Sequence, residues 1–161
     1  MTATYEKIAT TTLGSTASDV TFSSISGSYT DLVLIVNETC STGSGLNVQF
    51  NSDTGSNYSS TYMYGDGSST ASGRQSNQSF GTFGNTGGST IGTTIVNFQN
   101  YSNATTYKTY VSRTSTTGSV AGSYVSLWRS TSAINAIKLY PNSATWSSGS
   151  TFTLYGILKE A

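Results

Sequence analysis

The apolar residues of this chain occur in short runs separated by polar turn residues, and this pattern is the strongest constraint on its fold. Near the C-terminus three such runs follow one another, at Tyr124–Trp128, Ala133–Tyr140 and Phe152–Leu158. Each is β-branched or aromatic and is bounded by Ser, Gly, Asn or Pro, which is typical of strands joined by tight loops. Both tryptophans, Trp128 and Trp146, lie in this stretch. Because tryptophan rings bury large apolar areas, we predict that the core closes here.

The rest of the chain repeats the pattern. We predict further strands at residues 3–9, 19–24, 32–36, 46–50, 58–64, 90–99 and 107–113. Residues 32–36 read LVLIV, and five apolar residues in succession favour a central strand covered on both faces. Residues 68–90 contain only two aromatic side chains, so we predict a long excursion there with one weak strand near Arg74–Gln78.

These elements amount to about 8–10 short strands with no amphipathic helix. The 161 residues have the length of one domain. We therefore predict an all-β fold, a single-domain antiparallel β-sandwich over residues 1–161 that is jelly-roll-like. An immunoglobulin-like sandwich is disfavoured, because the paired cysteines around a tryptophan are absent. Within the domain, residues 1–10 suit an N-terminal arm that contacts a neighbouring subunit.

Composition narrows the classes of function. Charged side chains make up only 9% of the chain, and seven basic residues balance seven acidic ones, so we expect no nucleic-acid partner. No secretory signal is visible, and no apolar run approaches the ~20 residues of a membrane helix, so no membrane association is expected. The 30 Ser and 28 Thr resemble a disordered composition, but 11 Tyr, 6 Phe and 2 Trp indicate a folded chain. Cys40 is the single cysteine and is interpreted as a small residue near a strand end.

The chain has few residues that could carry catalysis. Histidine is absent, which removes Ser-His-Asp and Cys-His nucleophile systems and most sites for zinc, copper or iron. A pair of carboxylates remains, and the candidates are Asp53 and Asp66. Both lie in turn sequences, NSDTGSN and GDG, where aspartate is favoured for backbone reasons alone. We therefore expect no catalytic residue, no cofactor and no metal centre, although loop carboxylates of this kind also suit Ca²⁺.

Tyrosines and polar residues gather between residues 51 and 77. Tyrosine rings stack on glycans or partner proteins, and they also fill sheet faces, so both interpretations stay open. Arg129 pairs with a carboxylate of a neighbouring chain or caps a strand end, and the sequence favours neither. The residues that we predict to form receptor or partner loops are Asp53, Asn57, Tyr58, Tyr62, Tyr64, Asp66 and Arg74.

Several longer segments carry a family pattern. They are the opening MTATYEKIATTTLGS with FSSISGSYTDLVLIVN, the central FNSDTGSNYSSTYMYGDGSS, and the ending SLWRSTSAINAIKLYPNSATWSSGSTFTLYGILK. Together they resemble virion structural proteins of tailed bacteriophages, particularly those infecting marine bacteria and cyanobacteria. The middle of the chain, 75–100, carries no such pattern. The resemblance implies backbone roles for Gly149 and Gly156, and packing roles for the anchors Trp128, Trp146, Phe152, Leu154 and Tyr155.

The resemblance implies a structural role in a virus particle. We expect a non-enzymatic capsid decoration, or cement, protein on the outer shell, which binds the major capsid protein and itself as a homotrimer. The alternative is a tail-fibre or appendage module that binds a host receptor or glycan through loops 51–57 and 65–77. A carbohydrate-active enzyme built on Asp53 and Asp66 is a third interpretation. A virion protein is made in the host cytoplasm and released by lysis, which agrees with the missing signal.

Overall fold

The computed structural model describes residues 4–118 and 120–158. All the helical or strand elements assigned within these ranges are β-strands, without a helix among them. Twelve strands form two antiparallel sheets of eight and four strands, which confirms the predicted all-β sandwich. The strands are β1 (Tyr5–Thr12), β2 (Val20–Phe22), β3 (Asp31–Glu38), β4 (Gly45–Phe50), β5 (Tyr58–Gly65), β6 (Thr70–Gln78), β7 (Gly81–Asn85), β8 (Gly92–Phe98), β9 (Lys108–Thr116), β10 (Ala121–Trp128), β11 (Ile137–Pro141) and β12 (Thr151–Ile157).

Eight of these strands pair in a jelly-roll order. Strands β1, β2, β3 and β4 pair with β12, β11, β8 and β7 respectively, as if one long antiparallel hairpin had been rolled up. Successive strands of this hairpin alternate between the sheets, which gives the orders β1-β12-β3-β8 and β2-β11-β4-β7. Two four-stranded sheets of this kind make up a jelly roll.

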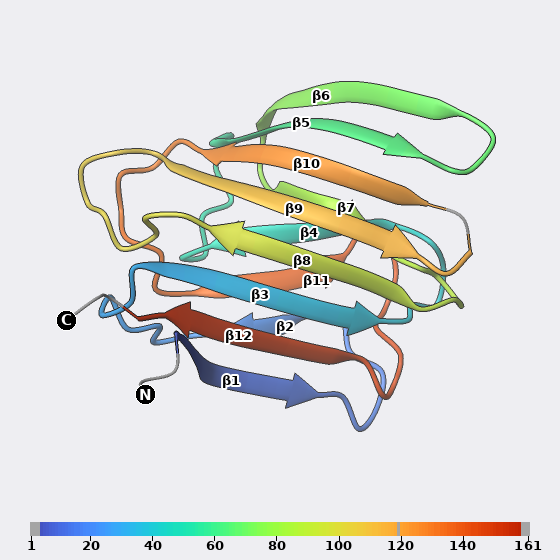
Figure 1. Cartoon of the computed structure of the whole chain (residues 1–161), viewed down its shortest axis with the longest axis horizontal. Helices are drawn as coiled ribbons and strands as arrows, with labels where there is room; N and C mark the ends of the chain where they lie inside the picture. The colour runs from blue at the N-terminus through green and yellow to red at the C-terminus, as the bar shows by residue number, and fades with distance from the viewer. Residues whose placement is uncertain (1–3, 119, 159–161) are drawn as a thin grey trace.

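Two additional hairpins widen one sheet only. Strand β9 pairs with β8, and β10, β5 and β6 follow it in turn, so the large sheet continues well beyond β8. In Figure 1 the strands of this large sheet lie in front and the small sheet lies behind. Strands β5 and β6 are at the top of the view, at the end of the large sheet opposite to β1. The small sheet ends at β7, which packs against β9 and β10. The hairpin β5–β6 therefore extends past that edge, and we call it the overhang.

Alternation of side chains separates the two faces of the large sheet. On β10, Tyr124, Ser126 and Trp128 are buried toward the small sheet, whereas Val125 is exposed on the opposite face. We call that opposite side the outer face. The core between the sheets is dominated by aromatic rings, of which Tyr58 and Trp128 stack and the other contacts are edge to face or tilted. These rings are Phe50, Tyr58, Phe83, Phe98, Tyr110 and Trp128.

The strand predicted near Arg74–Gln78 is present as part of β6, but the long excursion predicted over residues 68–90 is wrong, because the second strand β7 follows at Gly81–Asn85. Strand β7 reads GTFGN, a sequence that locally disfavours a strand, yet it pairs with β4. Phe83 is fully buried, and Gly81 lies against Tyr110, where a Cβ would overlap with the phenol oxygen. Core packing therefore selects a glycine-rich strand that local preference does not indicate. The strand predicted over 133–140 begins later, at Ile137.

Most of the predicted packing anchors lie between the sheets. Trp128, Trp146, Phe152 and Leu154 are all buried in the core. Tyr155 differs, because it follows Leu154 on β12 and alternation turns its ring to the outer face, where it is half-buried.

Gly149 and Gly156 are required to be glycine for different physical reasons. Gly149 has a φ of +87°, in the left-handed region that a side chain disfavours. Gly156 instead provides space, since a Cβ there would overlap with the ring of Tyr29.

The predicted N-terminal arm falls largely within the sheet. Residues 1–3 lie outside the described ranges, and from Tyr5 the chain forms β1, paired with β12 of the same chain. Strand β1 is an edge strand of the large sheet. Contact of this segment with a neighbouring subunit stays a prediction.

Candidate functional site

The seven predicted partner residues separate into three places in the structure. Asp53, Asn57 and Tyr58 join a hydrogen-bonded cluster at the end of β10. Asp66 lies in the turn between β5 and β6. Arg74, Tyr62 and Tyr64 lie on the overhang, where strand alternation points Arg74 to the outer face and the two tyrosines to the inner face.

The carboxylate of Asp53 accepts hydrogen bonds from three donors. They are Nε1 of Trp128 at 2.6 Å, Nδ2 of Asn57 at 2.9 Å and the backbone N–H of Gly55 at 2.8 Å. Partial burial opposes ionisation, but the hydrogen bonds from Trp128, Asn57 and Gly55 outweigh it and lower the pKa of Asp53. The ionised carboxylate of Asp53 therefore holds the indole of the buried Trp128 in place by a hydrogen bond.

Tyr58 completes this cluster from the core side. Its ring is fully buried and stacks on Trp128 with centroids 6.3 Å apart. Its hydroxyl donates to the backbone oxygen of Asp53 at 3.1 Å and accepts from the backbone N–H of Phe50 at 3.0 Å. Loop 51–57 is thus fixed to the core by Asp53, Asn57 and Tyr58, and Tyr58 is fully buried there.

Arg129 strengthens the same end of the sheet. Its guanidinium donates to Oγ of Ser59 at 3.0 Å, to the backbone oxygen of Ser56 at 2.8 Å and to Oδ1 of Asn77 at 3.0 Å. These bonds connect β10 to the start of β5 and to β6. Arg129 therefore links the end of β10 to the overhang by hydrogen bonds within one chain.

Asp66 organises the turn of the overhang. It accepts the backbone N–H groups of Ser68 at 2.9 Å and Ser69 at 2.7 Å, and both serine hydroxyls as well. The backbone bonds from Ser69 and Ser68, followed by their hydroxyls, hold the pKa of this exposed carboxyl well below its usual range. This is the turn role that the GDG sequence indicated.

Tyr62 and Tyr64 meet a third tyrosine, Tyr124, which sequence analysis did not single out. Tyr62 stacks on Tyr124 with ring centroids 5.3 Å apart and on Tyr64 with centroids 6.2 Å apart. Two glycines make room for these rings. A Cβ on Gly73 would lie 2.7 Å from the hydroxyl of Tyr62, and one on Gly122 would lie 2.9 Å from Cβ of Tyr64. Tyr124 was detectable in principle, because it lies four residues before the buried Trp128 on one strand and therefore on the same face.

The stacked tyrosines form one wall of a groove of about 220 Å³, and the facing wall is the small sheet near its β7 edge. We call it the tyrosine groove. Asn47 on β4 lies in it, only 2% exposed, as does Thr82 of β7, which donates to Oε1 of Gln75 at 3.2 Å. The lining residues are Gly45, Asn47, Tyr62, Tyr64, Gln75, Phe80, Thr82, Asn85, Tyr124 and Asn142.

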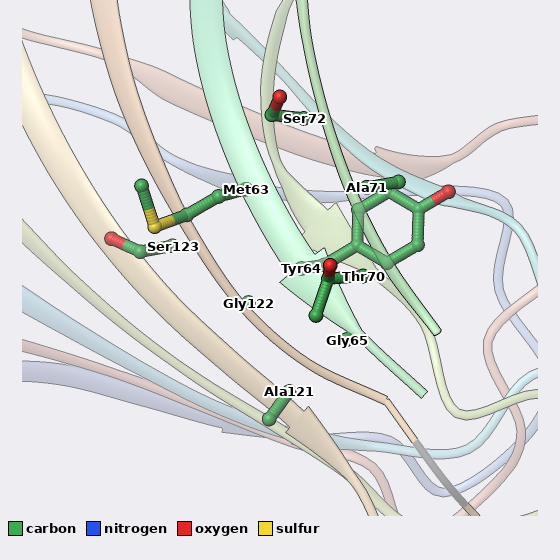
Figure 2. A pocket seen from close by; sticks show the side chains of 9 residues that line it. All are labelled: Met63, Tyr64, Gly65, Thr70, Ala71, Ser72, Ala121, Gly122 and Ser123. Atoms are coloured by element: carbon green, nitrogen blue, oxygen red, sulfur yellow. The ribbon is translucent and has the colours of Figure 1, made fainter. Parts of the chain in front are cut away.

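The outer face of the large sheet carries two shallow hollows over the overhang. The larger has a volume of about 590 Å³ and is lined by small side chains and backbone around Met63, which is 66% exposed. Figure 2 shows the side chain of Met63 and the ring of Tyr64 on opposite sides of β5, as strand alternation requires. The second hollow, of about 380 Å³, lies between Arg74 and Val125.

The outer face continues across the whole large sheet. One row of directly paired residues crosses all eight strands, and we call it the outer row. Its two ends are basic, its centre is mostly apolar, and Val125 within it is 55% exposed. The row is Lys7, Tyr155, Val33, Asn97, Val111, Val125, Thr61 and Arg74.

Two buried groups sit together on the inner side of the large sheet. Oε2 of Glu38 accepts from Sγ of Cys40 at 3.1 Å, and its Oε1 accepts from the backbone N–H of Gly87 at 2.8 Å. Burial raises the pKa of the Cys40 thiol to about 12, with the adjacent Glu38 adding to the effect. Burial also raises the pKa of Glu38. Cys40 is therefore an unreactive packing thiol.

Among residues 4–118 and 120–158, no group of three or more His, Cys, Asp or Glu side chains is close enough to hold a metal ion. A helix long and apolar enough to cross a membrane is likewise missing from this part of the chain.

Comparison with known proteins yields distant similarity to solved structures. No protein-family model and no curated protein matches the chain. One similar solved structure is the marine PL-14 alginate lyase from Aplysia kurodai, with 9% identity over 84% of this chain and 72% of that chain and a TM-score of 0.32. Another is the exo-inulinase from Aspergillus awamori, with 9% identity over 96% of this chain and 29% of that chain and a TM-score of 0.26. Similarities this low carry no functional argument.

Proposed function

We propose that this chain is a non-enzymatic virion structural protein of a tailed phage, which decorates the outer capsid shell and binds the major capsid protein through the outer face of its large sheet. The resemblance of the N-terminal, central and C-terminal segments to phage virion proteins supports this role. The observation that carries it is the outer face itself, which extends over eight strands. In Figure 1, which looks onto this face, no described segment crosses in front of it.

The size of the outer face suits a stable protein contact. With strands about 4.8 Å apart and a rise of about 3.3 Å per residue, eight strands of some seven residues span roughly 34 by 23 Å. That area is close to the ~800 Å² that each partner contributes to an interface of standard size. A decoration protein also gains from repetition, because many modest contacts on one shell act together once the subunits form a homotrimer.

The chemistry of the outer face suits a protein partner as well. Met63, Val125 and Tyr5 are large apolar side chains exposed on it. Serine and threonine hydroxyls surround them and provide uncharged hydrogen-bond partners at low desolvation cost. The carboxylates of Asp53 and Asp66 are both engaged by hydrogen bonds inside the chain, which supports a binding role over a catalytic one.

The test is decoration of capsids that lack this protein, measured by co-sedimentation with purified protein. Replacing Val125 or Met63 by Glu should weaken binding by roughly tenfold or more, since each buries a charge in the contact. Thr21→Glu is the matched control, because Thr21 is exposed on β2 of the small sheet and should leave binding unchanged. Equal binding by all variants would rule out the outer face as the docking surface.

Copy number separates the proposed role from the alternative of a tail-fibre or appendage module. A simple ratio of this chain to the major capsid protein in purified particles, measured by quantitative mass spectrometry, is the expected result. A ratio of a few per cent or less would instead assign the chain to the tail.

A further inference from the structure

The tyrosine groove has the chemistry of a binding site for an uncharged, hydroxyl-rich ligand. None of its ten lining residues is charged. Its polar side-chain groups are three phenols, the amides of asparagine and glutamine and the hydroxyl of Thr82, which together offer both donors and acceptors. An anionic ligand would need a cation in the wall, and a cationic ligand would need a carboxylate. Neither is present among the residues that line the groove.

Several of these polar groups have no partner within the described chain. The hydroxyls of Tyr62, Tyr64 and Tyr124 make no hydrogen bond there, and neither does the side-chain amide of Asn47. Asn47 is 2% exposed as a whole residue. The buried side-chain atoms without a hydrogen bond among the described residues are those of Tyr110 and Trp146, so the Asn47 amide is not a buried unpaired group. Burial, with the neighbouring phenols Tyr62 and Tyr64, raises the pKa of Tyr124 to about 12. The phenol of Tyr124 therefore remains a neutral donor at physiological pH.

We propose that the tyrosine groove binds one neutral hexopyranose unit of a saccharide. Aromatic rings pack against the apolar C–H faces of a pyranose, while the phenols and the amides of Asn47 and Gln75 bond its hydroxyls. Gln75 uses its Oε1 to accept from Thr82, which orients its amide N–H₂ as a donor. The volume of about 220 Å³ is below the ~300–1,000 Å³ of drug-sized sites and suits a single ring.

This site is independent of the docking surface proposed above. The tyrosines point to the inner face of the overhang, and the outer row points the other way. A protein bound through its outer face therefore keeps the tyrosine groove available, so that a decorated shell would present one saccharide site per subunit.

Saturation-transfer NMR on the purified full-length protein tests the proposal without any capsid. The probes are the methyl pyranosides of glucose, galactose, mannose and N-acetylglucosamine, with glucuronate as a charged counterpart. At least one neutral glycoside should receive saturation on its ring protons, and glucuronate should receive less. Tyr62→Phe and Asn47→Ala should each weaken binding roughly fivefold or more.

Two comparisons keep the result specific. Tyr107→Phe removes an exposed phenol outside the groove and should bind like the wild type. Tyr62→Phe keeps the ring and its stacking, so its folding, measured by thermal unfolding, should be close to that of the wild type. Absence of transfer to all four neutral glycosides, or transfer that the groove variants leave unchanged, would overturn the proposal. Neither result would bear on capsid binding through the outer face.

Discussion

The indole Nε1–H of Trp128 donates a hydrogen bond of 2.6 Å to Oδ2 of Asp53, although the two residues are 75 positions apart in the sequence. The bond connects one of the two buried tryptophan rings of the core to a turn that was a sequence candidate for catalysis or partner binding. It explains why an acidic residue is needed in this turn. Only an ionised carboxylate accepts from Trp128, Asn57 and the Gly55 backbone at once.

A double-mutant cycle should detect this coupling. Trp128→Phe keeps a ring but removes the donor, and Asp53→Asn replaces one acceptor oxygen by a second donor. Each change should lower the free energy of unfolding by about 1–3 kcal/mol, as expected for a hydrogen bond to a charged group. The two effects should not add, with a coupling of at least ~0.5 kcal/mol in denaturant unfolding. Asp66→Asn, in an exposed turn, serves as the comparison, and simple additivity would argue against the bond.

Stability at acidic pH should depend on Asp53. Its pKa is lowered in the folded state, so the folded chain binds fewer protons than the unfolded chain between the two pKa values. The stabilisation is therefore present above the ordinary aspartate pKa of about 3.9 and is lost as pH falls through the folded value. Thermal unfolding from pH 6 to pH 2.5 should show a steeper acid loss for the wild type than for Asp53→Asn. Parallel curves would contradict this.

Glu38 should give the opposite pH dependence. Burial raises its pKa in the folded state, so its contribution is full below the unfolded value of about 4.3 and is lost as pH rises through the raised value. Replacement by Gln removes that titration and retains an acceptor for the Gly87 N–H. Relative to the wild type, Glu38→Gln should gain stability between pH 4 and pH 8. A pH-independent difference in denaturant midpoints would show that Glu38 does not titrate in this range.

The close contact of Gly81 with Tyr110 predicts that a second substitution restores stability lost by a first. A Cβ at position 81 would overlap with the phenol oxygen of Tyr110, a fully buried ring that cannot move away easily. Gly81→Ala should therefore cost about 1–3 kcal/mol through overpacking. Adding Tyr110→Phe removes the overlapping oxygen and leaves contacts of 3.0 Å to Val48 and 3.1 Å to the Tyr110 ring. The double variant should regain much of the loss in chemical denaturation, and no regain would mean that β7 shifts instead.

The sequence alone determined the class of the fold and most of its strands. Period-two alternation and runs such as 32–36 are local signals, and the structure places strands at almost all of them. It also indicated the turn role of Asp66, because an Asx turn involves only neighbouring residues. The glycine-rich strand β7 was missed, since its stability comes from pairing with β4 and from burial of Phe83.

The tertiary structure decided which candidate residues come together. Asp53 and Tyr62 are close in sequence and share a polar, tyrosine-rich context, but one braces Trp128 and the other lines the tyrosine groove. Tyr124 and Asn47 complete that groove from distant strands. No local pattern encodes this assembly, because it depends on strand register and on how far the overhang extends past the small sheet. Local preference therefore specifies strands, while long-range pairing specifies the site.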